Sequence, residues 1–200
     1  MSFDLSRAVD IARLSLRFSR VERATCHEDG VRPETDSDHT VMLQLLTLYF
    51  CPEELDVGLA VQFALVHDLV EAYAGDAQTL TIDAQGKADK AAREAAALAR
   101  LRDEFIGSGM TKLIRLYEQQ KLPEARVVRI LDKVAPKLTH LLNGCAAAKV
   151  LVDQKGFEAA HARQYGELRE QYPEPHFDYL FVLLREAMYA SEEAWATNVA

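Results

Sequence analysis

Residues 66–76 read VHDLVEAYAGD, and this stretch places one imidazole and three carboxylates in a mainly apolar segment. On a helix that turns by about 100° per residue, His67, Asp68 and Glu71 fall within an arc of about 100°. Burying an imidazole and two carboxylates together is costly unless a cation pairs with them. The stretch therefore favours a divalent metal site on a buried helix. A polar face turned to solvent is the alternative interpretation of a single His-Asp pair.

Apolar residues recur at helical spacing on both sides of this stretch, and no segment alternates convincingly as a strand does. We expect helices over residues 3–19, 36–50, 56–73, 88–105, 111–120, 123–149, 157–171 and 175–195. The polar segment 20–37 is expected to be a loop, and the helix after residue 56 should end near Gly75. The pattern predicts an all-α bundle of about seven to nine helices in a single domain, residues 1–200. Its metal-site core would span about 5–145, with C-terminal helices over about 155–197 packed on it.

The composition is that of an ordinary globular protein, because 49% of the 200 residues are apolar and 27% are charged. The net charge of -8 gives no general reason to bind nucleic acid. The three cysteines form no CxxC pair, which suggests reduced thiols. We expect no signal peptide and no segment apolar enough to cross a bilayer. These observations favour a cytoplasmic protein without nucleic-acid or membrane partners.

Two further candidates for metal ligation lie on other predicted helices. His39 stands one turn into the helix 36–50, among residues that mainly form cores. Asp132 projects from an apolar stripe of the helix 123–149, where an unpaired charge would be costly. An ion pair with Lys133 or Arg129 would also explain Asp132, so neither candidate is decisive alone.

Together, His39, the doublet His67-Asp68 and Asp132 resemble the H…HD…D signature of the HD superfamily of metal-dependent phosphohydrolases. The stretch HDLVEAYAGD is similar to the HDxxExxxGD stretch of the small bacterial 5'-deoxynucleotidase branch, and ETDSDH, residues 34–39, is similar to that branch's approach to the first histidine. The resemblance covers about residues 5–145. It implies an all-α HD domain.

The resemblance also implies roles for individual residues. It makes His39, His67, Asp68 and Asp132 the ligands of one divalent ion, which could be Mn, Co, Fe, Ni or Zn. It implies catalytic roles for Glu71 and Asp76, as carboxylates that orient or deprotonate the attacking water. The sequence does not assign the base to one of these two. The remaining histidines lack ligand-like neighbours in the sequence, so no second metal is expected: His27, His140, His161 and His176.

Phosphate requires cationic donors besides the metal. Arg20 stands where the nucleotidase branch has an arginine beside a tryptophan, but here Val21 follows it, which is a departure at the family's nucleoside contact. Arg23 and Arg32 compete with it for phosphate, and solvated loop arginines are the alternative. Lys133, beside the last candidate ligand, would contact phosphate or pair with a carboxylate.

We expect a metal-dependent phosphohydrolase that converts deoxyribonucleoside 5'-monophosphates to nucleoside and phosphate. One alternative is a deoxynucleoside triphosphate triphosphohydrolase that releases triphosphate, because the longer loop 20–32 adds positive charge. Another is a non-catalytic, nucleotide-binding regulatory module. The resemblance also implies a homodimer.

Overall fold

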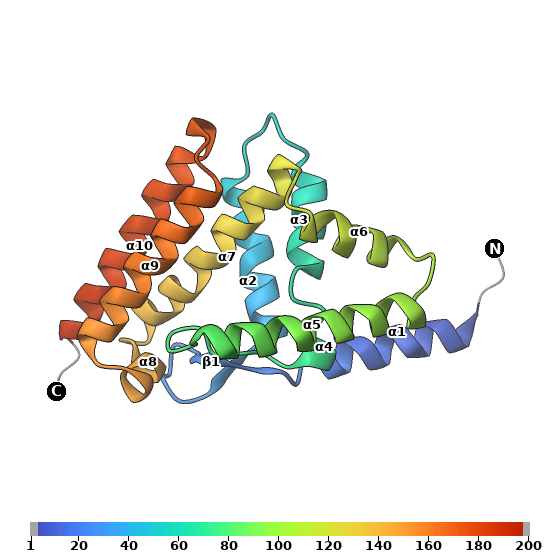
Figure 1. Cartoon of the computed structure of the whole chain (residues 1–200), viewed down its shortest axis with the longest axis horizontal. Helices are drawn as coiled ribbons and strands as arrows, with labels where there is room; N and C mark the ends of the chain where they lie inside the picture. Colours follow the sequence, from blue (N-terminus) through green and yellow to red (C-terminus); the bar gives the residue numbers. More distant parts are fainter. Residues whose placement is uncertain (1–3, 198–200) are drawn as a thin grey trace.

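A computed structural model describes residues 4–197 and shows a helical bundle (Figure 1). The helices, in chain order, are α1 Leu5–Phe18, α2 Asp36–Phe50, α3 Val57–Val66, α4 Glu71–Ala74, α5 Ala84–Glu104, α6 Gly109–Glu118, α7 Pro123–Leu142, α8 Ala146–Leu151, α9 Gln154–Gln171, the 3-10 turn η1 Pro175–Phe177, and α10 Asp178–Thr197. The prediction of an all-α fold is confirmed.

The central helix is α7, which packs against α2, α3 and α10. Ile130 and Leu131 of α7 are fully buried with Phe63 of α3 and Leu184 of α10 in one apolar cluster. Figure 1 shows α9 and α10 side by side at one end of the molecule, with α7 crossing its middle. Burial of apolar surface against α7 thus fixes the C-terminal helices on the domain.

A second apolar cluster joins α1 and α5 to the rest of the fold. Leu14 and Phe18 of α1 are buried against Leu101 of α5. Asp4 caps α1 by accepting a hydrogen bond from the backbone N–H of Ser6 at 3.0 Å. This cluster places α5 beside α4, and so beside the polar stretch at residues 66–76.

The expected loop 20–37 contains a small antiparallel hairpin that the sequence did not reveal. Its strands are β1 Glu22–Cys26 and β2 Pro33–Thr35, with an irregular register between them. Strands this short contain too few residues for an alternation of apolar and polar side chains to be detected. The side chain of Asn143, just after α7, donates to the carbonyl of Cys26 at 2.7 Å and so holds the hairpin beside α7.

The expected continuous helix over residues 56–73 is interrupted, so that prediction was wrong in its middle. Helix α3 ends at Val66, residues 67–70 form turns, and α4 starts at Glu71. The predicted end at Gly75 is confirmed: Gly75 has a φ of 71°, and its N–H donates to the carbonyl of Glu71 at 2.8 Å. Because the chain is not helical at residues 67–70, the side chains of His67, Asp68 and Glu71 do not follow the spacing of a regular helix, yet all three line one cavity.

Helix α7 is shorter than predicted, because it ends at Leu142 rather than at residue 149. Gly144 and Cys145 have positive φ values, which stop the helix before α8 begins. Pro136 lies inside α7 and also lines the cavity described below.

One segment is more apolar than we expected from the sequence. Residues Val57–Ala74 have a mean hydropathy of 1.3, which is enough by length and composition for a membrane span. The segment is interrupted at residues 67–70, and 44% of it is buried within the fold. Core helices of folded domains often have this composition, which makes it weak evidence for a span.

Candidate metal centre

The four predicted ligands converge although they come from three regions of the chain. His39 lies on α2, His67 and Asp68 follow the end of α3, and Asp132 lies on α7. One potential ligand atom from each residue lies within 4.8 Å of the corresponding atoms of the other three. Both histidines and Asp132 are buried. Two imidazoles and two carboxylates at this spacing are a suitable donor set for one divalent cation.

The ring of His67 is oriented by a backbone carbonyl. Its Nδ1 lies 2.8 Å from the carbonyl oxygen of Ala64, which can only accept a hydrogen bond, so Nδ1 carries the proton. Its Nε2 is therefore a lone-pair donor, and this buried atom has no hydrogen-bond partner. It lies 2.9 Å from Asp68 Oδ2 and 3.7 Å from Asp132 Oδ1. A buried imidazole lone pair facing two carboxylates fits a cation between them.

His39 is also flanked by carboxylates. Its Nε2 lies 3.1 Å from Asp132 Oδ1, and its Nδ1 lies 3.7 Å from Glu34 Oε1. Burial disfavours a charged imidazole, but Asp132 and Glu34 raise the pKa of His39 to about 9. Negative charge that favours a proton at this ring also favours a divalent cation. Thr25 donates a hydrogen bond to Glu34, which fixes that carboxylate beside the ring.

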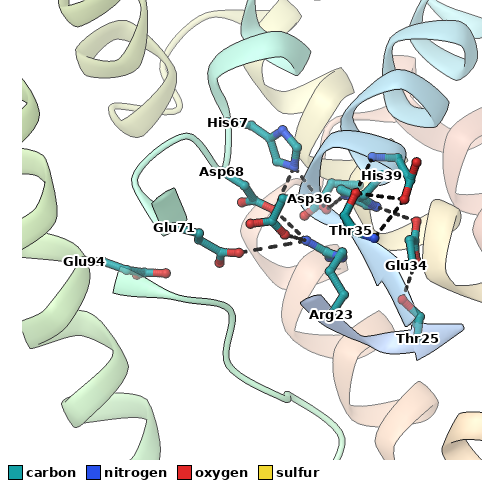
Figure 2. A network of polar contacts seen from close by, with 12 residues as sticks. Arg23, Thr25, Glu34, Thr35, Asp36, His39, His67, Asp68, Glu71 and Glu94 are labelled. Carbon is teal, nitrogen blue, oxygen red and sulfur yellow. Dashed lines mark hydrogen bonds and ion pairs between the residues drawn. The ribbon is translucent and has the colours of Figure 1, made fainter. Parts of the chain in front are cut away.

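Arg23 of β1 is surrounded by carboxylates, as Figure 2 shows. Its guanidinium lies 3.0 Å from Asp36, 3.1 Å from Asp68 and 4.0 Å from Glu71. Asp36 is fully buried, and burial raises its pKa to about 6 although Arg23 opposes the shift. Arg23 thus links the hairpin to the candidate ligand Asp68 and neutralises part of the negative charge.

Glu71 and Asp76, the predicted catalytic carboxylates, line the same cavity as three of the candidate ligands, His67, Asp68 and Asp132. Burial raises the pKa of Glu71 above its ordinary value, and the nearby Asp68 and Asp36 add to the shift. Lys90 of α5 opposes it from 3.4 Å. The turn at Gly75, where the helix was predicted to end, places Asp76 at the wall of this cavity. Glu71 therefore holds a proton more readily than an exposed carboxyl does, and a divalent cation bound nearby would favour its carboxylate form.

The cavity has a volume of about 590 Å³ and extends along α7 away from the four candidate ligands. Two of the predicted phosphate-binding residues, Arg23 and Lys133, line it. Lys133 lies 2.8 Å from Asp132 Oδ2 and is partly exposed. Arg20 is exposed and does not belong to the cavity wall, and its predicted role in phosphate binding stays a prediction.

Sequence reasoning missed several residues of this site. Glu34 and Asp36 stand in the quoted motif ETDSDH but received no role, although both are buried. Lys90 and Glu94 lie in the helix expected over residues 88–105, to which the sequence assigned no functional residue, yet both line the cavity. Only the packing of α5 against α4 shows that these charges face the site.

The comparison with protein families supports this site. The family model described as an HD domain matches residues 16–175. The chain belongs to the HD-domain family. The family implies a divalent metal, and the cluster of His39, His67, Asp68 and Asp132 in this HD domain could hold one.

Curated relatives of this HD domain carry the name 5'-deoxynucleotidase HDDC2. The protein of Danio rerio is 32% identical over 106 residues, which cover 52% of each chain. The protein of Homo sapiens is 31% identical over 125 residues, which cover 60% of each chain. The matched region thus spans about half to three fifths of the length of these relatives.

Solved structures show the same fold at lower sequence identity. A predicted metal-dependent phosphohydrolase from Magnetospirillum magnetotacticum MS-1 superposes with a TM-score of 0.68 at 21% identity, over 94% of this chain and 97% of that one. A conserved hypothetical protein from Pyrococcus furiosus gives a TM-score of 0.65 at 24% identity, over 90% and 99%. Both comparisons support the helical architecture.

Proposed function

We propose that this HD domain is a metal-dependent phosphohydrolase that acts on deoxyribonucleoside 5'-monophosphates and releases nucleoside and phosphate. The observation that carries the proposal is the convergence of two histidines and two aspartates beside a cavity. Three of the four, His67, Asp68 and Asp132, line that cavity together with the buried Glu71. The names of the curated relatives support the substrate class.

We propose His39, His67, Asp68 and Asp132 as the metal ligands. When bound there, a divalent cation would lower the pKa of a coordinated water and neutralise charge on the phosphate. The mixed nitrogen and oxygen donors suit Mn, Co, Fe, Ni or Zn. Within the described chain, the unpartnered Nε2 of His67 is the atom that best fits this role.

Glu71 and Asp76 are proposed to accept the proton of the attacking water. Glu71 is the stronger candidate of the two for this step, because it is buried beside Lys90 and close to the candidate ligand Asp68. A divalent cation bound at the centre would lower the pKa of Glu71 and so free its carboxylate to accept a proton. Lys90, 3.4 Å from Glu71, would hold the glutamate in position. Asp76 lines the same cavity and would orient the water.

Arg23 and Lys133 are proposed to bind the phosphate group. Both contact candidate ligands, through Asp68 and Asp132 respectively, so their charges lie next to the expected position of the phosphate. Cationic donors at this position would offset the negative charge that develops on the phosphoryl oxygens. Arg20 lies outside the cavity wall and would contribute only if its loop moved.

The test measures product release by the purified protein with manganese or cobalt, against deoxynucleoside mono- and triphosphates. We expect inorganic phosphate from the monophosphates. Asp68→Ala should abolish turnover, whereas Cys145→Ala, which changes a buried thiol outside the cavity wall, should retain it. Release of triphosphate would favour a triphosphohydrolase instead. Metal binding without any turnover would favour a regulatory nucleotide-binding module.

We also propose that the protein is cytoplasmic and forms a homodimer. Helix α2 carries an exposed apolar stripe, in which Leu45 is 63% and Tyr49 is 82% exposed. Exposed apolar stripes of this kind often mark association surfaces. Sedimentation equilibrium should show a dimer that Leu45→Glu dissociates, and a monomeric wild type would contradict the proposal.

A further inference from the structure

Lys137 of α7 is a buried lysine without a carboxylate partner. It is 4% exposed, lines the cavity, and donates a hydrogen bond to the side-chain oxygen of Gln164 on α9. No carboxylate oxygen of residues 4–197 lies within 4.0 Å of its ammonium group. Lysines are almost never fully buried unless they are paired. We therefore expect an anionic group of a ligand in the cavity to pair with the ammonium group of Lys137.

His140 lies one turn beyond Lys137 on the same helix and lines the same cavity. It is 3% exposed, and its Nδ1 has no hydrogen-bond partner among the described residues. Its ring packs edge-on against Phe157, with the ring centres 5.3 Å apart. A buried polar atom that stays unsatisfied costs about 1 to 3 kcal/mol, so a group in the cavity that bonds to it would be favoured.

The cations of α7 form a row. Arg129, Lys133 and Lys137 follow one another at four-residue spacing, and all three line the cavity. Of these, only Lys133 pairs with a carboxylate in the described part of the chain, and its partner is the candidate ligand Asp132. Like charges in one row repel each other, and an anion between them would relieve the repulsion.

We propose that Lys137, His140 and Gln164 form a second anion subsite, which receives a phosphate of the nucleotide other than the one that is cleaved. Along α7, Lys137 lies about 7.5 Å and His140 about 12 Å beyond Asp132, at a rise of about 1.5 Å per residue. The subsite is therefore separate from the metal centre but within reach of the same nucleotide. This inference rests on the proposed function, because it takes the cleaved phosphate to lie at the metal centre.

Two classes of nucleotide offer such a second phosphate. A 5'-di- or triphosphate carries it on the same chain as the cleaved bond, and a 3',5'-bisphosphate carries it on the other side of the sugar. Both present the same chemistry to Lys137, a phosphate dianion that accepts hydrogen bonds from an ammonium and an amide. Lys137 donates a hydrogen bond to the side-chain oxygen of Gln164. The side-chain amide of Gln164 also has two N–H donors, and these can point toward the phosphate.

The test compares Lys137→Gln with Lys155→Gln, an exposed lysine of α9, in the full chain. The substrates are deoxyadenosine 5'-monophosphate, 5'-triphosphate and 3',5'-bisphosphate, and the quantity measured is kcat/KM. We expect Lys137→Gln to lower kcat/KM about tenfold to a hundredfold for a nucleotide with a second phosphate, because a charge-assisted hydrogen bond is lost. The monophosphate should change less than about threefold. Loss with the triphosphate points to the polyphosphate chain, and loss with the bisphosphate points to the sugar phosphate.

Equal losses for all three nucleotides, or no loss for any, would overturn the second subsite. Calorimetry with EDTA present measures the affinity of both variants for the same nucleotides, and so tests the subsite without turnover. Absence of turnover with every nucleotide would therefore defeat the proposed function, while the binding comparison would still decide this inference. If Lys137→Gln does not fold, Lys137→Met takes its place, since it keeps the unbranched stem of the side chain.

Discussion

Two pairs of buried histidines lie in neighbouring regions of the molecule and differ in what surrounds them. His39 and His67 have ring centres 5.3 Å apart, and each has a carboxylate oxygen within 3.1 Å of its Nε2. His140 and His161 instead both pack against Phe157, with ring centres 5.3 and 4.1 Å from that of Phe157. In this second pair only His161 contacts a carboxylate, Glu192 at 2.8 Å, within residues 4–197.

The difference shows that burial alone does not identify a metal-binding histidine. All four rings are nearly inaccessible to solvent. Carboxylates raise the pKa of His39 to about 9, whereas burial, assisted by the charge of Lys137, lowers the pKa of His140 to about 4. The first environment favours a cation and the second favours a neutral ring that packs. Four changes, taken from the largest expected effect to the smallest, test this contrast.

Asp132→Ala should have the largest effect, because it removes a carboxylate shared by both rings of the first pair. A catalytic metal contributes several kcal/mol, so turnover should fall on the order of a thousandfold or more. Metal content by mass spectrometry should fall with it. Asp103→Asn, at an exposed position of α5, is the matched control and should keep both metal and turnover.

Glu71→Gln should lower kcat by about a hundredfold to ten-thousandfold while the metal stays bound, because it removes the proposed proton acceptor. Glu94→Gln changes another carboxylate of the cavity wall, which Figure 2 shows away from the group around Arg23. It should cost less than about tenfold. Equal losses in both variants would assign the effect to cavity charge rather than to proton transfer.

Arg23→Met should lower the free energy of unfolding by about 3 kcal/mol, because it leaves the buried carboxylate of Asp36 unpaired. Urea unfolding monitored by circular dichroism measures the difference. Arg20→Met, at an exposed position, should change it by less than about 0.5 kcal/mol. Similar losses at the two arginines would show that the pairing seen for Arg23 is not what stabilises the hairpin.

His140 should make the fold sensitive to acid. The pKa of His140 is about 4 in the folded state against an ordinary value of 6.5. The neutral ring therefore contributes fully to the free energy of unfolding above pH 6.5, and this contribution is lost as the pH falls toward 4. The loss between pH 7 and pH 4.5 should be about 2 kcal/mol. His140→Gln should flatten the stability curve by this amount, whereas His176→Gln, at an exposed position, should leave it unchanged.

The sequence allowed prediction of the fold class from local patterns, and the resemblance to the HD superfamily singled out the four candidate ligands that the structure brings together. Helical spacing of apolar residues is repeated along most of the chain, and the HD doublet lies in a short recognisable stretch. The end of the helix at Gly75 was also predictable, because glycine commonly occupies this position.

Features that depend on distant contacts were not predictable. The hairpin is stabilised by pairing between β1 and β2 and by the bond from Asn143, and none of these appears as a local pattern. The partners of Lys90 and the isolation of Lys137 depend on how α5 and α9 pack, which a single sequence does not show. The same holds for the interruption at residues 67–70, where a sequence suited to a helix is overridden by tertiary structure.

Pro136 stands between the turn of α7 that carries Asp132 and the turn that carries His140. Since proline has no N–H, the carbonyl oxygen of Asp132 lacks the donor that the fourth following residue normally provides. The hydrogen-bond pattern of α7 is therefore interrupted between the turn of the candidate metal centre and the turn of Lys137 and His140. An inhibitor that bridges both turns and offers an amide N–H to this oxygen would use an acceptor that an uninterrupted helix keeps occupied.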